Sequence, residues 1–167
     1  SQHPVIRRCR AAGNGTDGLF LCWRVKGGIF EENRLEGNGH AGISIGHKDT
    51  DNVFRRNQVL RNKRWGIYFR PESEPMGGHR NRFEENRIAD NGGPEGGAGI
   101  RIEGETHDLL FERNTIEETR AGGARTQRHA VSAGPKASAI VLRGNRILGY
   151  PDDGVHTEGP ADAVKVE

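Results

Sequence analysis

The chain has 167 residues, of which 32% are hydrophobic and 29% charged, with 25 glycines and a formal net charge of +2. Leu, Ile, Val and Phe make up about a fifth of it, a level at which chains of high net charge are disordered. Because 25 basic residues nearly balance 23 acidic ones, composition leaves both a folded and a disordered chain open. No apolar run approaches the roughly 20 residues of a membrane-spanning helix, and no charged-then-apolar leader opens the chain, so we expect no membrane partner.

The basic residues are spread along the chain instead of forming one stripe. They comprise 20 Arg and 5 Lys and alternate with acids such as Glu31–Glu32 and Glu84–Glu85. This distribution predicts no nucleic acid partner. The two cysteines, Cys9 and Cys22, are too few for a disulfide framework, and we expect no disulfide.

A repeat with a period of 24 residues organises the first half of the chain, as is typical of a solenoid. Three columns keep this spacing: an apolar residue followed three positions later by Asn or Cys, then a second Asn, then a glycine. The columns hold Ile6, Phe30 and Phe54 with Cys9, Asn33 and Asn57, then Asn14, Asn38 and Asn62, then Gly18, Gly42 and Gly66. Because Cys9 takes the place of Asn, we expect it to be a small buried side chain.

Three further copies continue the repeat through insertions, which makes six in all. They begin at Phe83, Phe111 and Leu142. In most copies the glycine leads into a short alternating strand, as in Gly42–Ile45 and Gly66–Phe69, and the fourth copy reaches Gly99–Ile102 after a longer gap. In the fifth copy either Gly123–Thr126 or Ala130–Ala133 fills this place.

Each copy contains two or three short runs that alternate apolar and polar residues, and none has room for a helix of usual length. Such a unit cannot bury its apolar side alone, whereas copies stacked at about 4.8 Å per layer share a continuous core. Asn tolerates left-handed backbone conformations and stacked Asn side chains form ladders, so we place the Asn columns at the corners. The sequence predicts an all-β parallel solenoid of about six coils, a single domain over residues 1–167.

The repeat resembles that of a known superfamily. The units from Asn52–Phe54 through Asn57–Val59, and from Asn62 to Gly66–Phe69, are similar to the right-handed parallel β-helix repeat of the pectin-lyase-like superfamily. The likeness covers nearly the whole chain and implies a right-handed parallel β-helix. The likeness does not imply a single function, because the superfamily includes polysaccharide lyases, glycoside hydrolases, uronan epimerases, phage tailspikes and adhesins.

The strand that begins at each glycine offers the best surface for a ligand. If Ile43 and Ile45 point inward, Ser44 points outward, and by register so do Phe20, Tyr68, Arg101 and His156. Positions two residues further on add Arg70 and Glu103, and positions two residues before each glycine add His40 and Arg64. Arg binds carboxylates, a Tyr ring stacks on a sugar, and His or Tyr exchanges protons with it. We therefore expect an acidic-polysaccharide site, with His40, Tyr68 and Arg70 as catalytic candidates and Arg64, Arg101, Glu103 and His156 as substrate-binding candidates.

His40 lies in a segment with a local likeness of its own. Gly39–Gly46 is similar to the Gly-His-Gly segment of polygalacturonases, and Asn14–Gly18 is similar to their Asn-Thr-Asp-Gly segment. Those hydrolases place a paired-Asp strand between the two segments to supply the acid and the base, and this chain has none there. Lyases and epimerases of uronic acids need a cation for the carboxylate and a base for the neighbouring proton, and the resemblance allows Arg, Lys, His or Tyr in these roles.

The sequence leaves two classes of function open. The chain is either a lyase, epimerase or hydrolase of an acidic polysaccharide, or a non-catalytic structural, adhesin or binding module whose surface charges pair with one another. No pair of the seven His residues has the spacing of metal ligands, so we expect no cofactor, and Asp49–Asp51 and Asp152–Asp153 give only thin support for calcium. The insertions Pro71–Arg80, Gly92–Ala98 and Arg120–Ala137 should border one sheet edge and shape the binding face.

Both ends of the repeat lack a capping element. Ser1–Pro4 leads directly into the first copy, and residues 159–167 resemble the start of another strand. Because β-helices normally cover their unpaired strand edges, we expect a segment of a longer β-helix, or ends that self-associate. A polysaccharide ligand favours an extracellular or periplasmic location.

Overall fold

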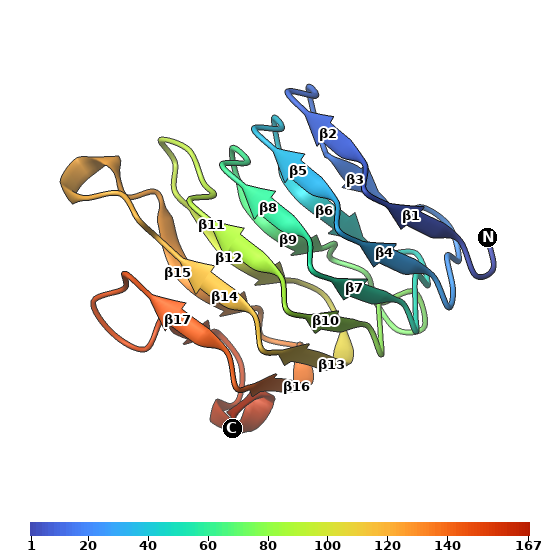
Figure 1. Cartoon of the computed structure of the whole chain (residues 1–167). Helices are drawn as coiled ribbons and strands as arrows, with labels where there is room; N and C mark the ends of the chain where they lie inside the picture. Colours follow the sequence, from blue (N-terminus) through green and yellow to red (C-terminus); the bar gives the residue numbers. More distant parts are fainter.

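The computed structural model describes residues 1–167 and shows a parallel β-helix with three parallel sheets along its length (Figure 1). Each of six coils contributes one strand to each sheet, and a last strand in the first sheet begins a further coil. The predicted fold is confirmed. Helical structure is limited to two short 3-10 turns, Gly122–Ala124 and Ala161–Ala163. The structure therefore contains no helix with the length and apolar character of a membrane span.

The strands are short and recur in the same order in every coil. The first sheet contains β1 (Val5–Arg7), β4 (Ile29–Glu31), β7 (Val53–Arg55), β10 (Arg82–Glu84), β13 (His107–Glu112), β16 (Ser138–Arg143) and β19 (Val164–Val166). The second contains β2 (Arg10–Ala12), β5 (Arg34–Glu36), β8 (Gln58–Leu60), β11 (Arg87–Ala89), β14 (Thr115–Glu117) and β17 (Arg146–Leu148). The third contains β3 (Leu19–Phe20), β6 (Ala41–Ile45), β9 (Trp65–Phe69), β12 (Gly97–Ile102), β15 (Gln127–Ala133) and β18 (Val155–Thr157).

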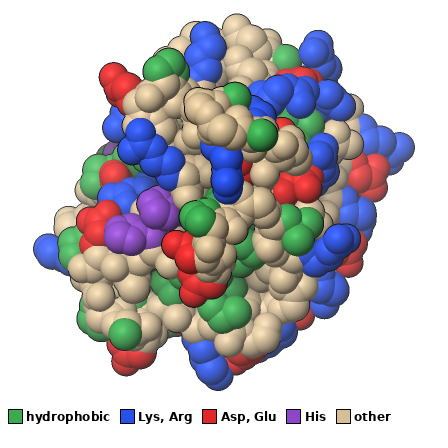
Figure 2. All heavy atoms as spheres, turned by 90° about the vertical axis from the view of Figure 1, so that its left-hand side faces the viewer, with side chains coloured by type: hydrophobic (Ala, Val, Ile, Leu, Met, Phe, Trp, Pro, Cys, Tyr) green, Lys and Arg blue, Asp and Glu red, His purple; other side chains and the backbone are tan.

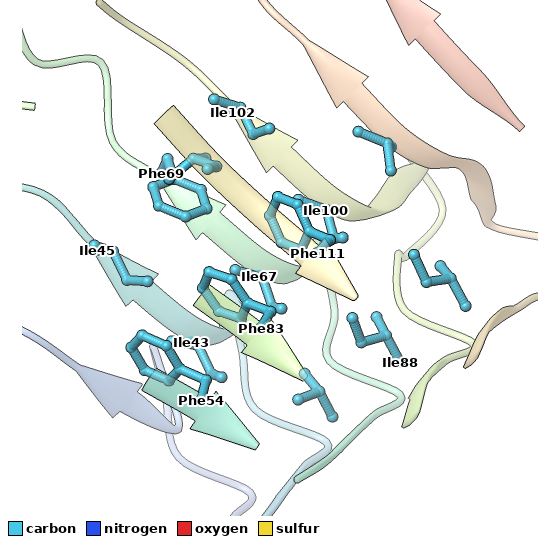
Figure 3. Packing of buried hydrophobic residues seen from close by; sticks show 14 of the residues in the cluster. Ile43, Ile45, Phe54, Ile67, Phe69, Phe83, Ile88, Ile100, Ile102 and Phe111 are labelled. Atoms are coloured by element: carbon cyan, nitrogen blue, oxygen red, sulfur yellow. The ribbon is translucent and has the colours of Figure 1, made fainter. Parts of the chain in front are cut away.

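One narrow apolar core runs along the inside of the coils (Figure 3). A column of Phe rings from the first sheet forms its centre. The ring centroids of Phe30, Phe54, Phe83 and Phe111 are 4.7, 4.6 and 4.8 Å apart in turn. These distances match the spacing of neighbouring strands, so each ring covers the next and excludes water along the axis. The low apolar content of the chain is enough because one narrow core serves all the coils.

Buried Asn side chains form ladders at the corners. Asn57 Nδ2 donates to the carbonyl oxygen of Phe30 and to Asn86 Oδ1, both at 2.9 Å. The left-handed residue is the one before each ladder Asn, as at Glu32 (φ 56°) and Arg56 (φ 52°). The expectation that Asn itself is left-handed is wrong, because its side chain points along the ladder while the preceding residue makes the corner.

The cysteines lie outside the core. Cys9 is at the first-coil end of an Asn column, where its backbone N–H donates to Asn33 Oδ1 at 3.0 Å. Its side chain is exposed, so the expectation of a buried Cys9 is wrong. Cys22 is also exposed, and both are free thiols.

The register of the third sheet places the expected outward residues in one column. Ser44 pairs with Phe20 and Tyr68, Tyr68 with Arg101, Arg101 with Ser132, and Ser132 with His156. The fifth coil uses Ala130–Ala133, the second of the two predicted alternatives. The column inferred from the 24-residue period is confirmed, including its passage through the insertions.

The insertions border the third sheet at both of its edges. Residues 71–80 follow β9, whereas residues 92–96 precede β12 and residues 119–126 precede β15. Because the strands of the sheet run in one direction, the first insertion lies at their carboxyl ends and the other two lie at their amino ends. The expectation that all three border the same edge is wrong.

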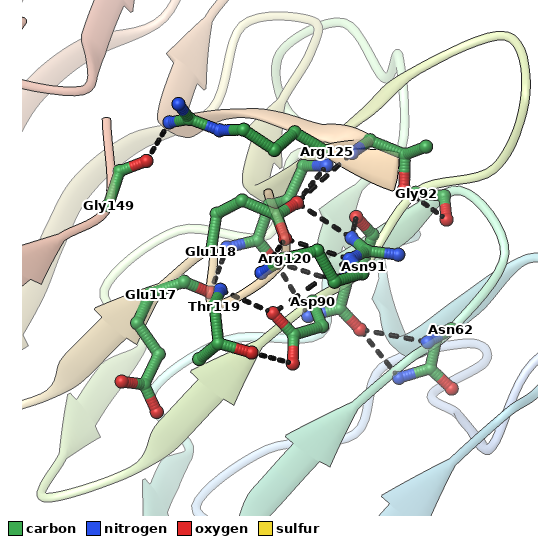
Figure 4. Close-up of polar contacts among 12 residues, drawn as sticks. Asn62, Asp90, Asn91, Gly92, Glu117, Glu118, Thr119, Arg120, Arg125 and Gly149 are labelled. Carbon is green, nitrogen blue, oxygen red and sulfur yellow. Dashed lines mark hydrogen bonds and ion pairs between the residues drawn. The ribbon is translucent and has the colours of Figure 1, made fainter. Parts of the chain in front are cut away.

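A buried carboxylate fixes the insertion before β15 (Figure 4). Glu118 accepts hydrogen bonds from the backbone N–H of Arg120 at 3.0 Å, Thr126 at 3.1 Å and Gln127 at 2.8 Å, and from the Arg120 guanidinium at 2.7 Å. Burial alone would raise the pKa of Glu118, but the Arg120 guanidinium and the backbone N–H groups outweigh it and lower this pKa below its ordinary value. The ionised Glu118 side chain therefore connects the two ends of this loop.

Candidate functional site

A groove follows the amino edge of the third sheet. It consists of two adjoining hollows of about 370 and 280 Å³ that share Arg64, Glu95 and Gly96. The first is also lined by Gly39, His40, Lys63, Gly93 and Pro94, and the second by Trp65, Gly97, Ala98, Arg101, Arg128, His129, Ser132, His156 and Glu158. The shared residues make the two hollows one surface, which we call the edge groove. The insertion before β12, residues 92–96, forms part of its rim.

The edge groove contains three cations that form no ion pair and one carboxylate, Glu95, that forms none either. Lys63, Arg64 and Arg128 form no ion pair, in contrast to most Arg residues of the chain. The Arg64 guanidinium lies over the Trp65 ring, 5.1 Å from its centroid, where the stacking orients it. These groups are free to bind an anionic ligand.

In the C-terminal half of the groove, the lining side chains contact one another through hydrogen bonds, an ion pair and ring stacking. Arg101 lies across the strands, donating to Ser132 Oγ at 2.7 Å and to Glu158 Oε1 at 2.7 Å. His129 and His156 stack with their ring centroids 4.8 Å apart. Figure 2 shows the side of the molecule nearest the C-terminal coils, where two adjacent His side chains lie among basic and acidic ones. Arg101 is therefore oriented before any ligand arrives.

His40 combines an oriented ring with access to the groove. Its Nδ1 lies 2.9 Å from Asp17 Oδ1, and the same oxygen accepts the backbone N–H of Ala41 at 2.9 Å. Because Asp17 holds Nδ1, the Nε2 atom is the ring nitrogen left for a ligand. The ring also contacts Tyr68 edge to face, with centroids 5.3 Å apart.

Tyr68 and Glu103 form a closed pair beside the groove. The Tyr68 hydroxyl donates to Glu103 Oε2 at 2.8 Å. Burial raises the pKa of Tyr68, and the hydrogen bond to the negatively charged Glu103 raises it further. Tyr68 therefore holds its proton and is better suited to donate a hydrogen bond than to act as a base.

The Arg70 side chain is mostly buried on the outer face of the third sheet. It donates to Ser44 Oγ at 2.9 Å and to the Leu21 carbonyl at 2.9 Å, and its guanidinium lies 3.5 Å from the buried Asp49 carboxylate. The Phe20 ring covers it, with the guanidinium carbon 4.4 Å from the ring centroid. Its side chain is 12% exposed. This geometry favours a positioning role over contact with a ligand.

The structure brings only part of the predicted site together. Four of the seven candidates line the edge groove: His40, Arg64, Arg101 and His156. The other three, Tyr68, Arg70 and Glu103, lie on the same sheet but do not line it, and the function of all seven stays a prediction. Sequence reasoning missed Lys63, Trp65, Glu95, Arg128 and His129. The run Lys63–Trp65 offered a signal, while Arg128 and His129 lie in the coil whose register the sequence left open.

A second polar cluster lies at the carboxyl edge of the third sheet. The rings of His79 and His107 stack at 3.8 Å, and Glu74 Oε1 lies 3.1 Å from His79 Nε2 and 2.7 Å from His107 Nε2. The backbone N–H of His107 donates to His79 Nδ1 at 3.2 Å, which places the proton of a neutral His79 on Nε2. The two His residues are 28 positions apart, as are Phe83 and Phe111. The spacing between these two copies of the repeat could therefore have predicted that the two His residues are neighbours.

Comparison with known proteins identifies one family and several similar structures. The family model described as periplasmic copper-binding protein (NosD) matches residues 1–130. No curated protein matches the chain. The A-module of the Azotobacter vinelandii mannuronan C-5 epimerase AlgE4 is similar at 14% identity and a TM-score of 0.63, covering 99% of this chain and 58% of that one. The periplasmic alginate epimerase AlgG is similar at 16% identity and a TM-score of 0.60, covering 98% of this chain and 39% of that one.

These structural likenesses concern the fold. At such low identity they show that the chain shares the β-helix of the epimerases. The chain spans between 38% and 58% of the length of the similar structures. The aligned region is therefore a part of each epimerase structure.

Proposed function

Since the chain belongs to the NosD family and folds as a β-helix, we propose that it is a carbohydrate-directed domain that binds an acidic polysaccharide in the edge groove. The observation that carries this proposal is the set of unpaired cations, Lys63, Arg64 and Arg128, next to the Trp65 ring. Cations bind uronate carboxylates, and an aromatic ring stacks on the apolar face of a sugar. The similar structures described as alginate and mannuronan epimerases support this class of ligand.

The path of the polymer follows from the repeat. Arg64, Arg101 and Arg128 belong to three successive coils of the third sheet. Arg64 and Arg128 precede Trp65 and His129, which both pair with Ala98 of the coil between them, whereas Arg101 lies three positions beyond Ala98. An extended chain along the solenoid axis passes one coil about every 4.8 Å and therefore meets Arg64 and Arg128 about 10 Å apart. A polymer with one carboxylate per sugar is therefore a better match than a neutral glycan.

A binding measurement with matched variants tests this proposal. Calorimetric titration with mannuronate and galacturonate oligomers should give saturable binding to the wild type, and neutral gluco-oligomers should give none. The double variant Arg64→Gln/Arg128→Gln loses two charge-assisted contacts, each worth about 1.5–3 kcal/mol, so its affinity should fall about a hundredfold or more. The control Arg146→Gln/Lys165→Gln removes two cations outside the groove and should bind like the wild type. Equal affinity of both double variants would contradict the proposal.

Catalysis at His40 is a second candidate function, favoured by its place in the groove lining and by the Asp17 contact, which occupies Nδ1 and leaves Nε2 for a ligand. In both β-elimination and epimerisation, Nε2 would take the proton next to the uronate carboxylate while Arg64 neutralises that carboxylate. In β-elimination the bond to the neighbouring glycosidic oxygen then breaks and this oxygen takes a proton from water, and in epimerisation water returns a proton to the opposite face of the sugar. Proton NMR of the oligomers would detect unsaturated ends or inverted residues. Product that disappears in His40→Gln with binding retained would support an enzyme, and binding without product would favour a non-catalytic module.

Copper, which the family description names, is not the ligand that we propose. The group of donors closest to a metal site is Glu74, His79 and His107. The proton on His79 Nε2 occupies the lone pair that a metal would need, and the face-to-face rings do not direct their in-plane lone pairs to one point. These residues do not fit a preformed copper site.

A further inference from the structure

A third hollow lies at the opposite edge of the third sheet from the edge groove. It measures about 390 Å³ and is lined by Gln2, Arg24, Lys26, Lys48, Thr50, Glu74, Pro75, His79 and Arg80. None of these residues lines the edge groove, and none is hydrophobic. We call it the corner hollow. Its lining is that of a site for a polar ligand.

The corner hollow carries an excess of positive charge. Arg24 and Lys48 form no ion pair, while Lys26 and Arg80 share the single carboxylate of Asp51, at 3.8 and 2.8 Å. The one acidic lining residue, Glu74, is matched by His107 at 2.7 Å. This contact lowers the pKa of Glu74, while the His107 pKa is raised by Glu74 and Asp108 against the effect of burial. The cations of the hollow therefore outnumber the carboxylates that neutralise them.

The two unpaired cations stand on a strained and repeated backbone. Arg24 (φ 64°) and Lys48 (φ 63°) are both left-handed, and each follows another left-handed residue, Trp23 (φ 70°) or His47 (φ 48°). Such conformations cost about 1–3 kcal/mol for each residue other than glycine. The repeat places Arg24 one coil from Lys48, since the Arg24 N–H donates to the His47 carbonyl at 2.9 Å. Two strained backbone segments that carry positively charged side chains thus lie next to each other at the same corner.

His79 adds a hydrogen-bond donor to this wall. The contact from the His107 N–H fixes the proton on Nε2, and Nε2 is buried without an aligned acceptor. Glu74 Oε1 is within 3.1 Å but not in hydrogen-bonding geometry. Burial, followed by the charge of His107, lowers the pKa of His79 and keeps the ring neutral. A buried donor that lacks an acceptor is costly, and an oxygen of a bound anion would satisfy it by displacing the Glu74 carboxylate, which now stands next to Nε2.

We infer that the corner hollow binds an oxyanion, with Arg24 and Lys48 as the charge clamp and His79 Nε2–H as a neutral donor. Phosphate, sulfate and carboxylate groups all meet this requirement. The bound oxyanion is either a free inorganic anion or the acidic group of a glycan. The site is separate from the edge groove and stands whether or not that groove binds polysaccharide.

Titration of the full chain followed by two-dimensional NMR tests this site. Inorganic phosphate, sulfate and galacturonate oligomers form three arms at constant ionic strength, and binding should shift the His79 imidazole resonances saturably. Arg24→Gly/Lys48→Gly removes both cations at left-handed positions that glycine favours, so the variant should stay folded and lose affinity at least tenfold. Arg146→Gln/Lys165→Gln should bind as the wild type does.

The arms also separate the sources of the anion. Shifts with phosphate or sulfate identify a free inorganic anion, and shifts with the galacturonate oligomers alone identify a glycan; either result supports the site. The Arg64→Gln/Arg128→Gln variant of the edge groove should retain these shifts, so the failure of one proposal is distinguishable from that of the other. No saturable shift in any arm, or equal weakening in Arg146→Gln/Lys165→Gln, would overturn the inference.

Discussion

Replacement of Asn57 by Ala removes a central link of a corner ladder. In the wild type the backbone N–H of Asn33 donates to Asn57 Oδ1, and Asn57 Nδ2 donates to the Phe30 carbonyl, both at 2.9 Å. Asn57 is 1% exposed, so water does not replace its side chain. Asn86 Oδ1 keeps the backbone N–H of residue 57 as a partner at 2.9 Å. The substitution therefore leaves one buried N–H without a partner, and it removes the side-chain donor of the Phe30 carbonyl, which keeps its place in the strand ladder with β7.

The expected loss follows from these two groups. The unsatisfied N–H costs about 1–3 kcal/mol and the lost bond to the Phe30 carbonyl about 0.5–1.5 kcal/mol, so the free energy of unfolding should fall by about 1.5–4.5 kcal/mol. Urea unfolding followed by circular dichroism measures this difference.

Asn14→Ala is the matched control in another Asn column. Asn14 is exposed, and its side chain makes one hydrogen bond, to Asn38 Oδ1 at 2.9 Å. We expect a loss of no more than about 1.5 kcal/mol. If the two variants lose the same free energy of unfolding, the reasoning that buried ladder contacts hold the corners is refuted.

Two further substitutions test buried charges. Arg70→Ala leaves the buried Asp49 carboxylate without its cation, and urea unfolding should show a loss of about 3–5 kcal/mol that Arg70→Lys partly restores; wild-type stability of Arg70→Ala would contradict the positioning role. For Glu118, the folded-state pKa lies below its ordinary value of 4.5, so its contribution to stability is present above that pH and is lost as the pH falls through the folded pKa. Glu118→Gln should be less stable than the wild type at neutral pH, with a difference in free energy of unfolding that shrinks on acidification, and a constant difference would contradict this.

The repeated columns explain why so much of the fold was predictable. A period of 24 residues specifies which residues meet between coils, and it correctly aligned Ser44 with Tyr68 and, through the insertions, Arg101 with His156. Residue types alone did not show that the residue before each Asn makes the corner. That choice depends on the ladder hydrogen bonds, which form only between stacked coils.

The site was less predictable because insertions and long side chains decide it. Alternation correctly gave the outward direction of Arg70, but the side chain then folds back over Ser44 toward Asp49. Arg128 lies at the start of β15, and the loop that leads into this strand is held by buried Glu118. Such contacts join residues outside the repeat columns, so no periodic pattern reports them.

The most direct test of the edge groove uses the two Trp side chains. Trp65 lines the groove, whereas Trp23 lies in the first coil outside it, so two indole N–H signals distinguish the two surfaces. Titration with a mannuronate oligomer in a proton–nitrogen NMR experiment should shift the Trp65 signal saturably, and Arg64→Gln/Arg128→Gln should abolish the shift at the same concentrations. A mannuronate oligomer that binds the wild type while the Trp65 signal stays unmoved would contradict the account.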